Sequence, residues 1–206
     1  GINVPTDDYL PGLRQICDEH DWLLMLDEIQ TGMGRTGEWF AYRHAGILPD
    51  VVSLAKALGN GVPVGACMAR GVAAEMLTPG SHGTTFGGNP LATRAALATL
   101  DVMESGDLVA QAALRGQQLL NGFRDRLAGQ PGVTSIRGRG MMIGIELDRP
   151  CAELVGRAIE RGLLINVTAG RVVRLLPPLI TTENQAKMIV DQVSELILDF
   201  LAEPDA

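Results

Sequence analysis

Short apolar runs divide the first half of the chain. Leu23 to Leu26 is a continuous apolar run, which predicts a strand buried on both faces, as in a parallel sheet. The run from Asp50 to Leu54 predicts a second buried strand, and Val64 to Met68 predicts a third. Asp8 precedes apolar side chains at helical spacing, so we expect it to cap a helix before the first strand. Helix and strands in this order indicate a layered α/β domain.

The pattern changes in the second half of the chain. Asn89 followed by Pro90 predicts the start of a helix that runs to about Glu104. Apolar residues at helical spacing predict another helix from about Leu108, which ends at Gly129. We therefore divide the chain into one domain at residues 1–105 and a second at residues 106–206. The elements expected in the second domain are then a hairpin of 133–137 and 141–147 with Arg139 in its turn, a helix at 151–161, strands at 163–166 and 172–175, and a final helix that opens with a capping box from Thr182 to Gln185.

Composition narrows the class of protein. The 206 residues, 46% of them hydrophobic, suffice for a globular core, and no apolar run is long enough to span a bilayer. The net charge of −7 comes without a basic cluster, which argues against nucleic acid as a partner. Scattered cysteines and isolated histidines indicate neither a disulfide framework nor a metal site, so we expect a cytoplasmic protein with Cys17 and Cys67 in its core. Because the chain starts with Gly1 rather than Met, we expect a fragment of a longer protein.

Two residues with reactive side chains follow predicted strands. Asp27 ends the first strand and Lys56 comes just after the second. The carboxyl ends of parallel strands form the edge at which open α/β sheets bind ligands, so we expect both side chains at that edge. A carboxylate and an amine there suit pyridoxal phosphate (PLP), because the carboxylate keeps the pyridine nitrogen protonated and the amine binds the cofactor covalently. For either residue alone a plain structural role is the favoured explanation, in which Asp27 caps a turn and Lys56 is a solvated surface lysine at the start of a helix.

The glycine-rich segment Gly32 to Gly37 matches the dinucleotide-binding pattern G-x-G-x-x-G. That pattern requires the first glycine to end a strand and a helix to follow at once. Here Asp27 to Thr31 separate the glycine from the strand, and the aromatic segment Trp39 to Tyr42 leaves little room for a crossover helix. We therefore reject a dinucleotide-binding fold.

A resemblance to a known family decides between a PLP site and plain structural roles for Asp27 and Lys56. Four segments resemble class III PLP-dependent aminotransferases of the acetylornithine/ornithine type, in family order and with family-like spacing: Leu26 to Gly37, Ser53 to Gly61, Ser81 to Pro90, and Val173 to Leu179. The resemblance extends over essentially the whole chain but covers only about the C-terminal half of a family member. It implies the fold of the aspartate-aminotransferase type (fold type I). Residues 1–105 are then the C-terminal half of the PLP-binding large domain, and residues 106–206 the small α+β domain.

The resemblance also implies roles for individual residues. Lys56 would carry PLP, and Asp27 would pair with its pyridinium nitrogen. Arg174 would bind the substrate α-carboxylate, because its planar fork matches a carboxylate; without the resemblance, a surface ion pair is the simpler reading. The remaining implied contacts are Glu28, Ile29, Gln30 and Thr85 for the cofactor, with Thr85 binding its phosphate, and Thr84 for the substrate.

By resemblance, the reaction is the transfer of the ω-amino group of N-acetylornithine to 2-oxoglutarate in arginine biosynthesis, in a cytoplasmic homodimer with shared active sites. Lys56 would be the general base. Ornithine, succinyldiaminopimelate and 4-aminobutyrate aminotransferases are the near alternatives, and a catalytically incomplete truncated chain is another. The N-terminal half of the family supplies further pocket residues, so we expect the chain by itself to be inactive.

Overall fold

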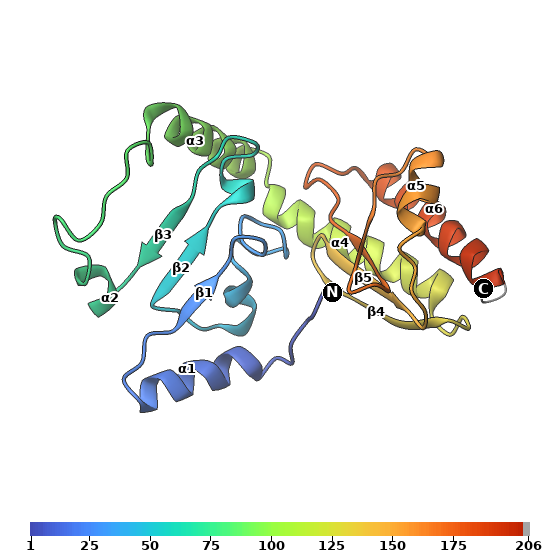
Figure 1. The fold of residues 1–206 in the computed structure, drawn as a ribbon, viewed down its shortest axis with the longest axis horizontal. Coiled ribbons are helices and arrows are strands. Elements are labelled where there is room, and N and C mark those ends of the chain that lie inside the picture. The colour runs from blue at the N-terminus through green and yellow to red at the C-terminus, as the bar shows by residue number, and fades with distance from the viewer. Residues whose placement is uncertain (204–206) are drawn as a thin grey trace. The chain divides into compact units, whose positions relative to one another are not determined.

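The computed structural model describes residues 1–203, which form two compact units (Figure 1). The N-terminal unit is Pro5–Ala110. The C-terminal unit combines Gly1–Val4 with Gln111–Ala206 and is described as far as residue 203. Within residues 1–203, no helix combines the length and the apolar character that crossing a bilayer requires.

The N-terminal unit contains a three-stranded sheet in the order β1-β2-β3 (Figure 1). Strand β1 (Met25–Asp27) runs parallel to β2 (Val51–Leu54), and β3 (Ala66–Ala69) pairs antiparallel with β2. All three strands lie within or next to the apolar runs of the sequence. The helices of this unit are α1 (Tyr9–Glu19), α2 (Val72–Glu75) and α3 (Pro90–Ser105), with 3₁₀ turns at Ala41–Ala45 and Lys56–Leu58.

The first strand is not buried on both faces, and the expectation that it would be is wrong. Met25 is 66% exposed. It lies opposite Val51 at the edge of the sheet, whereas the buried residues Val52 and Leu54 belong to the other face. Cys67 is likewise exposed rather than in the core, because it lies on the other edge strand, β3, all of whose residues are exposed. An apolar run predicts a strand, but burial depends on what packs over it.

The carboxylate of Asp50 links three parts of this unit: α1, the residue before β1, and the residue after β3. It accepts a hydrogen bond from Arg14 on α1 at 2.6 Å and another from the Leu24 N–H at 2.8 Å. Arg70, just after β3, lies 3.6 Å from the same carboxylate. Burial raises the pKa of this carboxyl, but the hydrogen bonds from Arg14 and Leu24 outweigh that effect, so the pKa of Asp50 lies below its usual range.

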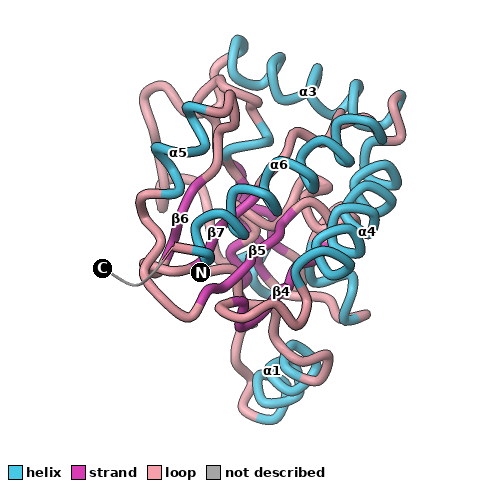
Figure 2. Tube along the Cα trace, turned by 90° about the vertical axis from the view of Figure 1, so that its right-hand side faces the viewer, coloured by secondary structure: helices cyan, strands magenta, loops and turns pink. Residues whose placement is uncertain are grey.

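The C-terminal unit is a four-stranded antiparallel sheet with three helices (Figure 2). The strand order is β4-β5-β7-β6. One continuous cluster of buried side chains, drawn from all three helices and from β5 and β7, forms its core. The elements are α4 (Leu108–Leu127), β4 (Val133–Arg139), β5 (Met142–Leu147), α5 (Leu154–Glu160), β6 (Asn166–Thr168), β7 (Val172–Leu175) and α6 (Glu183–Ala202).

Local signals placed several element ends correctly. Asn89 caps α3 by accepting a hydrogen bond from the Ala92 N–H at 3.1 Å, and Thr182 and Gln185 form the capping box of α6. Asp8 occupies the N-cap of α1, but its side chain makes no capping bond. Arg139 is not in the hairpin turn, because β4 extends through it and pairs it with Met142.

Strand β6 begins later than expected. Gly162 adopts a positive φ of 73°, and the Leu163 N–H donates back to the Ala158 carbonyl at 2.9 Å. The left-handed Gly162 and this hydrogen bond end α5 and hold the residues that follow it out of the sheet. Strand pairing therefore starts only at Asn166.

The first residues of the chain pack onto the sheet of the C-terminal unit. Ile2 is buried, and its main-chain oxygen accepts a hydrogen bond from Arg137 on β4. A Cβ on Gly144 of β5 would lie 2.9 Å from the Ile2 Cβ, so the strand leaves room for the isoleucine only because glycine stands there. Arg137 also donates to Glu146 at 2.7 Å.

Candidate functional site

Asp27 and Lys56 follow neighbouring parallel strands. Asp27 is the last residue of β1 and pairs in register with Ser53 of β2. Lys56 lies two residues beyond Leu54, the end of β2. Both side chains are exposed, so the carboxylate and the amine are accessible at the carboxyl edge of this parallel pair. This is the edge at which sheets of this kind bind ligands.

The backbone of Lys56 is in the left-handed region, with φ of 45°. This conformation costs a residue with a Cβ on the order of 1 kcal/mol. The surrounding turn holds it there, because the Lys56 carbonyl accepts from the N–H groups of Gly59 and Asn60, both at 3.2 Å. Gly59 has no room for a side chain, since a Cβ would lie 2.0 Å from the Val62 carbonyl oxygen. Sequence patterning did not reveal this strained backbone, although the glycines after Lys56 were a partial signal.

The residues after β1 form a tight turn with Glu28 inside it. Asp27 accepts a hydrogen bond from the Ile29 N–H at 2.9 Å. Glu28 is 3% exposed, and its carboxylate bonds to Thr31 and to the main chain at Tyr42. Ile29 is half-buried and Gln30 is exposed. The structure thus presents Asp27 and Gln30 outward and turns the Glu28 carboxylate into the protein.

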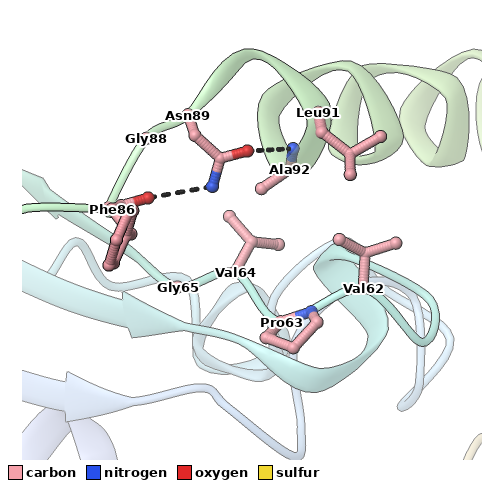
Figure 3. Close-up of a pocket in the computed structure, with 10 residues that line it drawn as sticks. Val62, Pro63, Val64, Gly65, Phe86, Gly88, Asn89, Leu91 and Ala92 are labelled. Atoms are coloured by element: carbon pink, nitrogen blue, oxygen red, sulfur yellow. Dashed lines mark hydrogen bonds between the residues drawn. The ribbon is translucent and has the colours of Figure 1, made fainter.

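Thr84 and Thr85 lie in the glycine-rich turn before α3. The Thr84 hydroxyl accepts a hydrogen bond from the Gly87 N–H at 3.2 Å, and Thr85 is exposed. Asn89 closes the turn by donating to the Phe86 carbonyl at 2.9 Å (Figure 3). The exposed Thr85 hydroxyl therefore lies just before the N-terminus of a helix, which is a favourable environment for an anion.

A cavity of about 540 Å³ lies beside this turn. In Figure 3, Val62 and Val64 point toward the start of α3, and Leu91 on the helix points back toward them. The cavity is lined by Val62, Pro63, Val64, Gly65, Phe86, Gly87, Gly88, Asn89, Leu91 and Ala92. Sequence reasoning missed it, because it is formed by two segments separated along the chain.

Arg174 lies on β7 in the C-terminal unit. It pairs in register with Gly144 of β5 and Asn166 of β6. Its Nε is buried, and no residue among 1–203 accepts a hydrogen bond from it. A buried guanidinium donor without an acceptor costs free energy.

Comparisons with known proteins agree on one family. The sequence profile of aminotransferase class-III matches residues 1–197. Acetylornithine aminotransferase of Nitrosomonas europaea is 54% identical over 98% of this chain and 51% of its own length, and acetylornithine aminotransferase 1 of Bordetella bronchiseptica is 55% identical over 98% and 52%. The ornithine aminotransferase structure from Toxoplasma gondii superimposes with a TM-score of 0.94 at 37% identity, covering 99% of this chain and 50% of that one. The chain thus spans about half the length of these relatives, and it belongs to the class-III aminotransferase family.

Proposed function

We propose that this chain is part of a PLP-dependent aminotransferase that transfers the ω-amino group of N-acetylornithine to 2-oxoglutarate, in arginine biosynthesis. The observation that carries the proposal is the placement of Asp27 and Lys56 at the ends of adjacent parallel strands, in a chain of this family. The relatives named for acetylornithine, at 54–55% identity, favour that donor. Ornithine is the second candidate, because of the fold match to ornithine aminotransferase at a TM-score of 0.94.

The residues of the N-terminal unit fit PLP chemically. Lys56 offers an exposed amine for covalent attachment, and Asp27 offers an exposed carboxylate for a protonated ring nitrogen. The exposed Thr85 hydroxyl, close to the N-terminus of α3, suits the phosphate. Ile29 would pack on the ring, and Gln30 would hydrogen-bond to its phenolic oxygen.

When bound, PLP supplies an electron sink that stabilises the charge developing as a carbon–hydrogen bond breaks. In our proposal the Lys56 Nζ takes that proton from the carbon that bears the transferred amino group and returns it at the next step. Asp27 holds a proton on the pyridine nitrogen and so maintains the electron sink. Arg174 binds the α-carboxylate of the 2-oxo acid or glutamate, and Thr84 contacts the substrate. The complete protein would be a cytoplasmic homodimer in which Thr85 reaches the partner's site.

The sequence allows a direct test of cofactor attachment. It contains only two lysines, Lys56 and the exposed Lys187 on α6. We would add PLP to the chain, reduce with borohydride, and quantify the cofactor mass on each lysine by peptide mass spectrometry. We expect Lys56 to label at a PLP concentration about tenfold lower than Lys187, a difference of about 1.4 kcal/mol in binding.

Two variants complete this test. Lys56→Ala should abolish the high-affinity label, and Lys187→Ala should leave it intact. Equal labelling of the two lysines in the unmodified chain would remove the basis for assigning Lys56 as the cofactor lysine.

A further inference from the structure

Glu28 forms a hydrogen bond through each of its main-chain and side-chain polar groups. Its N–H donates to the Ser53 carbonyl at 3.0 Å, and its carbonyl accepts from the Gly32 N–H at 2.9 Å. One carboxylate oxygen accepts from the Thr31 hydroxyl at 2.5 Å, and the other from the Tyr42 N–H at 3.0 Å. A carboxylate is rarely buried to this extent unless such bonds replace water. Glu28 therefore fixes the turn of residues 28–32 to β2 and to the segment around Tyr42.

This turn controls the carboxylate of the neighbouring Asp27. The Ile29 N–H, inside the turn, donates to the Asp27 carboxylate at 2.9 Å. The turn is also sterically closed, because a Cβ on Gly32 would lie 2.8 Å from the Glu28 carbonyl oxygen. A change at Glu28 is therefore transmitted through the Ile29 amide to Asp27.

We propose that Glu28 is a positioning residue, which acts on the cofactor only through Asp27 and the turn that carries Ile29 and Gln30. The inference rests on the proposed function for what Asp27 binds. It revises the role implied by resemblance, in which Glu28 itself contacts the cofactor, because the carboxylate of Glu28 is committed to Thr31 and Tyr42. Its chemistry is that of an acceptor for two donors, not that of an acid or base.

The test compares four variants of the full chain. Glu28→Ala removes both acceptors, and Glu28→Gln keeps one oxygen to accept from the Tyr42 N–H but replaces the oxygen that accepts from Thr31 by an NH2 group, which can only donate. Thr31→Val removes one donor at nearly constant volume, so it carries the test if Glu28→Ala does not fold. Glu38→Gln is the matched control, since Glu38 lies in the same segment with an exposed side chain at 3.6 Å from Arg43.

The first readout is amide hydrogen exchange at Ile29, Gly32 and Tyr42, measured by NMR without PLP. In Glu28→Ala we expect these amides to exchange at least about tenfold faster than in the unmodified chain. Thr31→Val and Glu28→Gln should accelerate exchange less, and Glu38→Gln should leave the exchange rates unchanged. The second readout is the PLP concentration for half-maximal borohydride-trapped labelling of Lys56. This PLP concentration should rise most in Glu28→Ala, less in Thr31→Val and Glu28→Gln, and not at all in Glu38→Gln. The labelling of Lys187 should be the same in every variant.

Each outcome decides the inference. Unchanged exchange at Ile29 in both Glu28→Ala and Thr31→Val overturns it, and so does faster exchange with an unchanged PLP dependence at Lys56. Should the unmodified chain show no preference for Lys56, the proposed function fails. The exchange measurement then still decides whether Glu28 controls the Ile29 amide.

Discussion

Substituting alanine for Gly116 tests the packing of the C-terminal unit. Gly116 is buried in the middle of α4 against the hairpin turn, where a Cβ would lie 2.3 Å from the Gly140 carbonyl carbon and oxygen. Ordinary contacts begin near 3.4 Å, so the helix and the hairpin must separate by about 1 Å. The clash is with backbone atoms, which cannot rotate away as a flexible side chain can, so the cost lies in the upper part of the range for overpacking, at about 2–3 kcal/mol. The better helix propensity of alanine returns about 1 kcal/mol. We expect Gly116→Ala to destabilise the C-terminal unit by about 1–2 kcal/mol.

The control is the same substitution at Gly156 on α5, where nothing lies within 4 Å of the new Cβ. There only the helix propensity acts, so Gly156→Ala should stabilise the unit by up to about 1 kcal/mol. The two variants make one chemical change with opposite expected signs. For a unit of about 100 residues, each kcal/mol shifts Tm by roughly 4–8 °C.

Spectroscopy can separate the two units. All tryptophans and tyrosines belong to the N-terminal unit, so tryptophan fluorescence follows that unit, whereas far-UV circular dichroism follows both. The unfolding of the C-terminal unit is therefore the transition seen by circular dichroism but not by fluorescence, and Gly116→Ala should lower the midpoint of that transition. A Gly116→Ala protein at least as stable as the unmodified chain would refute the close approach to Gly140. The residues that report are Tyr9, Trp22, Trp39 and Tyr42.

Three further predictions concern titration, reactivity and activity. The hydrogen bond from Arg137 outweighs burial and holds the pKa of Glu146 below its usual range, so Glu146 stabilises the fold above the unfolded pKa of about 4.3. Glu146→Gln should therefore be less stable than the unmodified chain in urea titrations at pH 7, by a difference that shrinks as the pH falls through the folded pKa. Burial raises the pKa of the Cys151 thiol to about 11. Iodoacetamide at pH 8, followed by peptide mass spectrometry, should therefore label exposed Cys67 within minutes and Cys151 only after unfolding. Rapid labelling of Cys151 in the folded chain would contradict its burial. The chain alone, with PLP, should form no measurable glutamate from 2-oxoglutarate and N-acetylornithine; turnover like that of the full-length Nitrosomonas europaea relative would show that this half suffices.

Features set by neighbouring residues were predictable from the sequence, whereas features set by packing were not. The caps of α3 and α6 were correct because Asn89 and the Thr182–Gln185 pair act within one turn. The burial of the first strand was wrong because Met25 depends on what covers its face of the sheet. Arg139 was misplaced because register, not the flanking glycines, decides where a hairpin turns.

The candidate site divides in the same way. The ends of two apolar runs brought Asp27 and Lys56 to one sheet edge, and β1 and β2 are indeed parallel neighbours there. The positive φ of Lys56 was not predictable, since a lysine carries no mark of a left-handed backbone. The inward orientation of Glu28 was also hidden, because a glutamate after a strand resembles any solvated carboxylate.

The packing of Ile2 on the C-terminal unit makes Pro5–Ala110 an insertion within a discontinuous unit. While Ile2 stays in place, both ends of the unfolded N-terminal unit are held by the C-terminal unit. Closing a loop of about 100 residues in this way is worth up to about 4.7 kcal/mol of entropy in the cross-link treatment. The stabilisation cannot exceed the strength of the anchor, which is about 2–4 kcal/mol for one buried side chain and one hydrogen bond. Replacing Ile2 by a polar residue would thus destabilise the N-terminal unit by enlarging its unfolded ensemble, without changing a contact inside it.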